Sequence, residues 1–270
     1  MEVLVQTSHG KANAYAYTGG KGFDPRLPCI VFVHGALNDH SVWTLLARWF
    51  AHHGHGVLAV DQPGHARSAG APLPSVEAVA AWVLALLDAA GVERAAMVGH
   101  SMGSLVALEA AAQAPQRVSS LAMLAPAYPM KVSEVLLTTA RETPLKAIDM
   151  VNAFSHSTLS PKPAYPGPGA WVPGGFRALM RRVHTAQRSV NLFHHDFTLC
   201  DSYANGLQAA AKVRCPATLI IGERDQMTTP RQTRDIAQAL EARAITVPAG
   251  HDLMAEAPEA VLMALREVLV

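Results

Sequence analysis

The sequence predicts an α/β fold: a mostly parallel, doubly wound sheet of about eight strands with helices on both faces. Two observations lead to this prediction. Short apolar runs rich in β-branched residues, such as Cys29–Val33, are typical of strands that are buried on both faces. These runs alternate along the chain with longer segments that carry helix start and stop signals. Such alternation is typical of a parallel sheet covered by helices on both sides.

Eight segments are predicted to be strands, each because it is apolar or β-branched and lies next to a turn signal. A link containing glycine and proline, residues 19–28, separates the two opening strands from the first buried strand. In order, the predicted strands are Val3–Thr7, Ala12–Thr18, Cys29–Val33, Val57–Val60, Arg94–Val98, Ser119–Leu124, Ala217–Ile221 and Ala244–Val247.

The helices predicted between these strands are recognised by their capping residues. Asn38 or Asp39 can cap the first helix, which Gly54 ends, and Ser75 caps the second, which Gly91 ends. The predicted helices are Ser41–His53, the segment from Ser75 to Ala90, Met102–Gln113, Arg231–Leu240 and Pro258–Val268.

Residues 127–205 interrupt the alternation, because they contain no buried strand and include five prolines between Pro161 and Gly175. A structureless loop of this length is uncommon inside a compact domain. We therefore predict a mainly helical lid inserted into a core formed by residues 1–126 and 206–270. Among its apolar side chains, Trp171 and Phe176 are the expected walls of a substrate pocket.

The charge balance and the cysteine count exclude several classes of protein. Lys and Arg number 22 and Asp and Glu 21, so a binder of nucleic acid or of an anionic membrane is not expected. The longest uncharged apolar stretch, Ala78–Leu87, is too short to cross a bilayer. Three cysteines without a C-x-x-C pair give neither a disulfide framework nor a zinc site. With no secretory signal at the N-terminus, we expect a cytoplasmic protein; the oligomeric state stays open.

The segment Gly99-His100-Ser101-Met102-Gly103 is the main chemical signal. It has the pattern G-x-S-x-G, with a predicted strand directly before it and a predicted helix directly after it. A serine in such a sharp strand-to-helix turn occupies strained backbone and exposes its hydroxyl at the end of the sheet. The free N–H groups at the start of the helix suit a developing oxyanion. We therefore predict Ser101 as a nucleophile.

A serine nucleophile needs a base and an acid that orients the base. His251 follows the strand Ala244–Val247, at the carboxyl end where open α/β sheets place their active sites. Asp225 follows the strand Ala217–Ile221 in the same way and is the expected acid. Glu223 is its local competitor, and Asp252 is a further alternative.

The chain resembles the α/β-hydrolase fold superfamily over nearly its whole length. The resemblance lies in the order Ser101, Asp225, His251 along the chain, in the sharp turn that carries the serine, and in the alternation of strands and helices. Within this superfamily, the chain looks like the lid-bearing serine hydrolases. The resemblance implies that the loop His34–Trp43 holds an oxyanion, with the backbone N–H groups of Ala36 and Met102 as donors.

Three segments of the chain show how far its sequence follows the patterns of this superfamily. The segment Asp61–Ser68 (DQPGHARS) resembles the family's D-x-x-G-H-G-x-S turn, with Ala66 in place of the second glycine and an implied structural role. The loop His34–Trp43 lacks the HGGG sequence that some lipases and esterases carry there. The strand-to-helix turn carries Ser101, whereas haloalkane dehalogenases and epoxide hydrolases of this fold carry an aspartate at that position.

The expected function is hydrolysis of a carboxylic ester, or of a related lactone or thioester, by a Ser-His-Asp triad. The substrate is expected to be a small to medium, largely apolar molecule, and no cofactor or metal is needed. Three other interpretations stay open: carbon–carbon bond hydrolysis of a dienoic or diketone compound on the same triad, a cofactor-free lyase or acyltransferase, and a non-catalytic small-ligand receptor.

Overall fold

The computed structural model describes residues 1–158, 171–187 and 189–269. Its centre is an eight-stranded sheet in the order β1-β2-β4-β3-β5-β6-β7-β8, parallel from β4 to β8. The first two strands are antiparallel to their neighbours. The strands are β1 (Glu2–Thr7), β2 (Gly10–Tyr17), β3 (Cys29–Val33), β4 (Gly56–Val60), β5 (Ala95–His100), β6 (Val118–Leu124), β7 (Ala217–Gly222) and β8 (Arg243–Val247). The predicted α/β class is confirmed.

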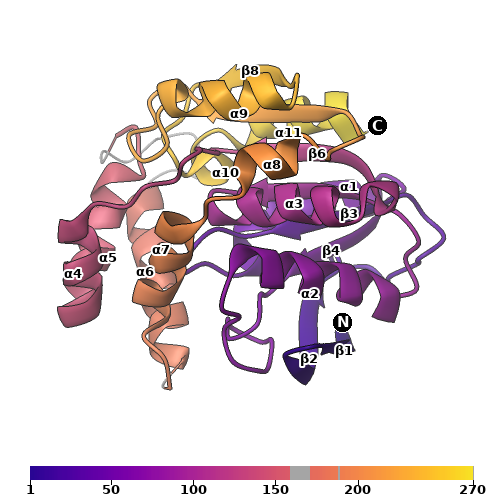
Figure 1. Cartoon of the computed structure of the whole chain (residues 1–270), viewed down its shortest axis with the longest axis horizontal. Coiled ribbons are helices and arrows are strands. Elements are labelled where there is room, and N and C mark those ends of the chain that lie inside the picture. Colours follow the sequence, from indigo (N-terminus) through magenta and orange to yellow (C-terminus); the bar gives the residue numbers. More distant parts are fainter. Residues whose placement is uncertain (159–170, 188, 270) are drawn as a thin grey trace.

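Helices cover both faces of the sheet (Figure 1). One face packs against α2 (Val76–Ala89), α3 (Met102–Gln113), α8 (Gly206–Ala210) and α9 (Arg234–Ala239). The other packs against α1 (Thr44–His52), α10 (Leu253–Glu256) and α11 (Pro258–Leu269). Alternate residues of β3 divide between the two cores, with Val31 and Val33 on the first face and Ile30 and Phe32 on the second. This two-sided burial explains the unbroken apolar sequence of the strand.

The element boundaries predicted from capping residues agree closely with the structure. Asp39 accepts the N–H of Ser41, and Ser75 accepts the N–H of Ala78, so both predicted caps are in place. The predicted helix 41–53 begins as a 3-10 turn, His40–Trp43, before α1, and the predicted helix 231–240 begins as a similar turn, Pro230–Thr233, before α9. The short helix α10 was not predicted.

Between β6 and β7 the described chain forms helices. They are α4 (Glu134–Glu142), α5 (Pro144–Phe154), α6 (Val172–Ala186), α7 (Leu192–Ser202) and α8. The first four lie together at one end of the sheet in Figure 1. Their buried apolar side chains form a separate hydrophobic cluster, here called the insertion cluster, which also takes in Leu37 from the loop after β3. Met227, from the loop after β7, packs against it. The helices therefore lie over the carboxyl ends of the parallel strands.

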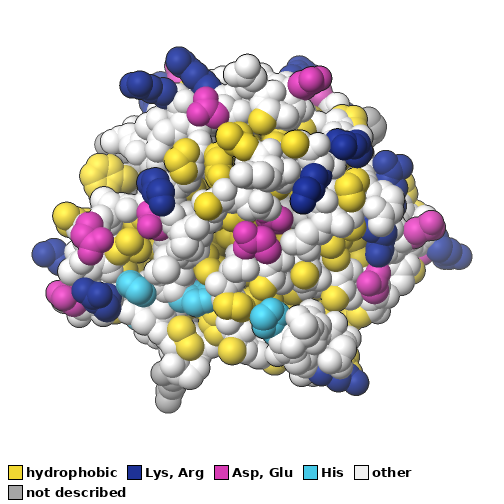
Figure 2. All heavy atoms as spheres, in the orientation of Figure 1, with side chains coloured by type: hydrophobic (Ala, Val, Ile, Leu, Met, Phe, Trp, Pro, Cys, Tyr) yellow, Lys and Arg dark blue, Asp and Glu magenta, His cyan; other side chains and the backbone are white. Residues whose placement is uncertain are grey.

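The surface agrees with the balanced composition. On the face shown in Figure 2, side chains of both signs are interspersed, without a basic stripe. No described helix combines the length and the apolar character needed to cross a membrane.

Candidate active site

Ser101 lies in the turn between β5 and α3, with backbone angles φ 53° and ψ −121°. A positive φ is unfavourable for a side chain other than glycine, so the surrounding structure must hold this conformation. Two glycines let the turn pack closely. A Cβ at Gly99 would overlap the backbone of Gly103, and a Cβ at Gly103 would overlap the carbonyl oxygens of Val33 and His34. The structure therefore contains the predicted turn, in which β5 leads through Ser101 directly into α3.

Substitution of Gly103 is expected to destabilise the fold. In Gly103→Ala the new methyl group must displace rigid backbone of β3, and overpacking of this kind costs about 1–3 kcal/mol. Thermal unfolding of the variant should show a lower Tm than the wild type. Gly22→Ala is the matched control, because its Cβ would meet nothing within 4 Å. Equal Tm values for Gly103→Ala and Gly22→Ala would contradict the close packing of the turn.

The structure brings His251 and Asp225 together. His251 Nδ1 lies 2.8 Å from Asp225 Oδ2, and both side chains are buried. The other oxygen, Oδ1, accepts the N–H groups of Met227 at 2.8 Å and Thr228 at 2.9 Å. An ionised carboxylate can only accept, so Nδ1 of His251 carries a proton, and in the neutral ring Nε2 is then the nitrogen with the free lone pair.

The electrostatics keep Asp225 ionised. Burial alone would raise its pKa, but the charge and the hydrogen bond of His251, with the hydrogen bonds from Thr228, outweigh burial and lower the pKa of Asp225 below its ordinary value. Sequence reasoning missed Thr228, whose hydroxyl lies 2.7 Å from Asp225 Oδ2 and 3.1 Å from His251 Nδ1. Its position three residues after an aspartate was the available signal, since short Asp–Thr spacings form such turns.

The two alternative acids lie elsewhere. The side chain of Glu223 is exposed, whereas the carboxylate of Asp252 lies 3.4 Å from His156 Nε2 at the end of α5. Among the described residues, no hydrogen bond is recorded between Ser101 and His251, although both line the same cavity. Such bonds commonly tighten only when substrate is bound.

The loop after β3 packs against the serine turn. A Cβ at Gly35 would lie 3.0 Å from His100 Nδ1 and 3.2 Å from the Cβ of Ser101. Ala36, the next residue, lines the same cavity as Ser101. Met102 is the first residue of α3, so its N–H belongs to the helix start, which has no intrahelical acceptor. Ala36 and Met102, the two residues whose N–H groups are expected to hold an oxyanion, therefore both lie near Ser101.

A cavity of about 300 Å³ opens at Ser101 and His251. Its walls are mostly apolar and come from the segment after β6, from α5 and α7, and from the loop after β7; they include Met130, Met150, Phe154, Phe197 and Met227. Of the two predicted wall residues, Phe176 lines a small recess beside Ser101. Trp171 is 51% exposed and lies at a second cavity, of about 700 Å³, which Ser101 does not line.

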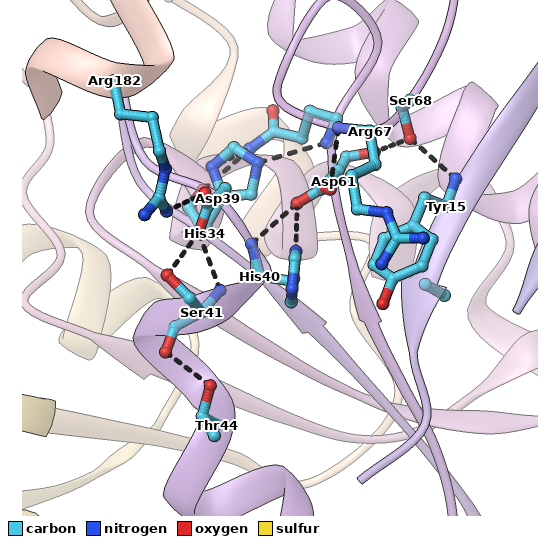
Figure 3. Close-up of polar contacts among 12 residues, drawn as sticks. Tyr15, His34, Asp39, His40, Ser41, Thr44, Asp61, Arg67, Ser68 and Arg182 are labelled. Atoms are coloured by element: carbon cyan, nitrogen blue, oxygen red, sulfur yellow. Dashed lines mark hydrogen bonds and ion pairs between the residues drawn. The ribbon is translucent and has the colours of Figure 1, made fainter. Parts of the chain in front are cut away.

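The segment Asp61–Ser68 is held at its two ends by hydrogen bonds, to His40 and to Tyr15 (Figure 3). Asp61 Oδ1 lies 2.8 Å from both the N–H and the Nδ1 of His40, and its Oδ2 accepts the N–H of Arg67. Ala66 has φ 41°, so the turn keeps the left-handed backbone that glycine favours although it carries alanine. The structural role implied for this segment is consistent with these contacts.

Among the described residues, one group of side chains has the spacing of metal ligands. Oxygens of Asp39 and Asp61 and a ring nitrogen of His40 lie within 4.8 Å of one another. Both carboxylates already accept hydrogen bonds, Asp39 from Ser41 and Arg182 and Asp61 from His40. We therefore interpret the group as a hydrogen-bond network that fixes the loop.

Comparisons with known proteins agree with this geometry. Residues 28–258 match the model of the alpha/beta hydrolase fold family. The acetyltransferase component of the acetoin cleaving system of Pseudomonas putida is 40% identical over 110 residues, which cover 40% of this chain but only 28% of that protein. Esterase YbfF of Escherichia coli is 27% identical over 89% of this chain and 92% of its own length. The crystal structure of the enol-lactonase from Burkholderia xenovorans superimposes with a TM-score of 0.79 at 24% identity, over 95% of this chain and 96% of that one.

Since the family model spans most of the sequence, the chain belongs to the alpha/beta hydrolase fold family. The resemblance predicted from the serine turn and from the order of the elements is therefore confirmed at the level of the family.

Proposed function

We propose that the protein hydrolyses a carboxylic ester, or a related lactone or thioester, through an acyl-enzyme on Ser101. Membership of the family and the likeness to an esterase support ester hydrolysis in general. The observation that supports the serine mechanism most is the buried His251–Asp225 pair, which lines one cavity together with a serine on a strained turn.

In the proposed mechanism, Ser101 Oγ attacks the carbonyl carbon while its proton passes to His251 Nε2. Asp225 holds the ring in the tautomer that leaves Nε2 free, and it stabilises the imidazolium that forms. His251 then gives the proton to the leaving alcohol oxygen as the ester bond breaks. Water, deprotonated by His251, cleaves the acyl-enzyme and restores the Ser101 hydroxyl.

The oxyanion of each tetrahedral intermediate would be held by the N–H groups of Ala36 and Met102. One such donor contributes about 3–4 kcal/mol to the stabilisation of the transition state. The start of α3 adds the positive end of its helix dipole, which favours negative charge at the same place.

The cavity supports a small to medium, largely apolar substrate. At about 300 Å³ it lies at the lower end of the range of small-molecule sites. Residues 127–205 would form the lid, because α5 and α7 supply part of the cavity wall. Phe176 remains a proposed pocket residue, since it lines the recess beside Ser101, whereas no role is proposed for Trp171.

A p-nitrophenyl ester series from acetate to decanoate tests this proposal. We expect turnover, with kcat/KM highest for acyl chains of about two to six carbons and falling towards decanoate, because the cavity is small. Steady-state rates with purified protein provide the measurement. Turnover of decanoate as fast as butyrate would contradict the proposed pocket, and absence of turnover across the series would contradict ester hydrolysis.

A further inference from the structure

The loop after β3 is tied to the insertion at Leu37, the residue directly after Ala36. The N–H of Leu37 donates to Asp196 Oδ2 on α7 at 2.8 Å, across 159 residues of sequence. The side chain of Leu37 is fully buried in the insertion cluster, together with Phe193 and Phe197 of the same helix. Leu37 also has φ 55°, which a leucine adopts only when its surroundings impose it.

The carboxylate that holds Leu37 has a second buried partner. His65 Nε2 lies 2.8 Å from the same oxygen of Asp196, and His65 Nδ1 lies 3.2 Å from the carbonyl oxygen of Pro63. Both oxygens are acceptors, so both ring nitrogens must carry protons and His65 is an imidazolium.

The electrostatics agree with this protonation state. Burial opposes a charged ring, but the charge of Asp196 and the hydrogen bond to it outweigh burial and raise the pKa of His65. For Asp196, burial is likewise outweighed by the charge of His65 and by hydrogen bonds from His195 and His65, so its pKa lies well below the usual range. The result is a buried ion pair with the acceptor oxygen aimed at the loop.

The two peptide groups on either side of Ala36 are therefore both fixed. His34 Nε2 accepts the N–H of Gln62, so His34 Nδ1–H donates to the carbonyl oxygen of Gly35 at 2.8 Å. In a planar trans peptide this turns the N–H of Ala36 away from His34. On the other side, Asp196 fixes the peptide that joins Ala36 to Leu37. The first restraint comes from the core of the protein and the second comes from the insertion.

We propose that Asp196, held by His65, is a positioning residue for the oxyanion loop: its carboxylate anchors the N–H of Leu37 and so holds Ala36 from the side opposite to His34, with the N–H of Ala36 facing the oxyanion. The inference rests on the proposed serine mechanism. Asp196 does not touch the substrate; it acts through the backbone. The oxyanion loop makes a second contact with the insertion: Arg182 of α6 donates a hydrogen bond to Asp39 in this loop at 2.7 Å (Figure 3). This contact also makes the position of the loop depend on the insertion.

The test compares two substitutions at one position. Asp196→Leu fills the space but removes the acceptor, and kcat for the preferred ester is expected to fall about 10- to 100-fold with KM changed less than about threefold. Asp196→Asn keeps an oxygen that can accept from Leu37 and should retain kcat within about fivefold of the wild type. If Asp196→Leu does not fold, Asp196→Ser, which is too short to reach Leu37, takes its place.

A transition-state probe separates positioning from a general loss of structure. Butylboronic acid forms a tetrahedral adduct with an active serine, and its Ki should rise in parallel with the fall in kcat, while KM does not. Tyr203→Phe is the matched control. It removes the buried hydrogen bond that the hydroxyl of Tyr203 donates to Glu109 (2.7 Å). This bond also joins the insertion to the core, but it does not involve the oxyanion loop. This control should lower Tm while leaving kcat and Ki unchanged.

Three results would overturn the inference: an unchanged kcat in Asp196→Leu, a loss that appears only in KM, or an equal loss of kcat in Tyr203→Phe. A failure of the proposed ester hydrolysis itself would give a different pattern of results. In that case the wild type shows no turnover that depends on Ser101, while the Leu37 amide proton still moves upfield in the NMR spectrum of Asp196→Leu, since it no longer bonds to a carboxylate.

Discussion

Ser101→Ala is expected to lower kcat for ester turnover by about 10⁴- to 10⁶-fold, the range found when a triad serine is removed. The hydroxyl oxygen forms the acyl bond, and no described side chain near it offers another activated nucleophile. The half-buried Ser101 packs in no apolar core, so the variant should fold with an unchanged Tm. Ester hydrolysis followed over hours at high protein concentration provides the measurement.

The control for this variant is Ser104→Ala, one helical turn further along α3. The hydroxyl of Ser104 donates to the carbonyl oxygen of Ser101 but does not line the cavity. Its loss should reduce kcat no more than about tenfold. Turnover in Ser101→Ala within tenfold of the wild type would refute the proposed nucleophile.

Asp225→Asn should reduce kcat by about 10⁴-fold with little change in the fold. The amide oxygen can still accept the N–H groups of Met227 and Thr228, so the turn is preserved. The amide nitrogen would then face His251 Nδ1 and favour the tautomer with a proton on Nε2. A ring in that state cannot take the proton of Ser101, so the acylation step is lost.

Glu223→Gln distinguishes between the two acids in this turn. Its side chain is exposed, so the rate should stay within about twofold of the wild type, as for most surface substitutions. Kinetics of the two variants under identical conditions provide the comparison. A large loss in Glu223→Gln with little loss in Asp225→Asn would reverse the proposed assignment of the acid.

Short-range sequence patterns were sufficient to predict most of the strands and helices of the fold. Buried parallel strands have an unbroken apolar sequence, so Cys29–Val33 was predicted with its observed bounds, and α3 followed from its position after the serine turn and before Pro115. The candidate site residues that follow strands were predicted on the same basis, because the topology brings the carboxyl ends of parallel strands together.

The parts that were missed depend on contacts between distant segments. The sequence around Asp196 did not reveal its role, because His65 and Leu37, the partners that define that role, lie 131 and 159 residues away. His65 was visible only as part of a family turn. Trp171 was predicted to line the substrate pocket as one of the apolar side chains of the insertion, but apolar character does not reveal which of two cavities a side chain lines.

The hydrogen bond between Asp196 and Leu37 also bears on how this protein could be re-engineered. The acceptor belongs to the insertion, whereas the imidazolium and the strained leucine belong to the core. An insertion transplanted from another hydrolase would leave His65 buried without its counter-ion, unless the graft supplied a carboxylate at the same point. Exchange of the insertion therefore requires positions 196 and 65 to be changed as a pair.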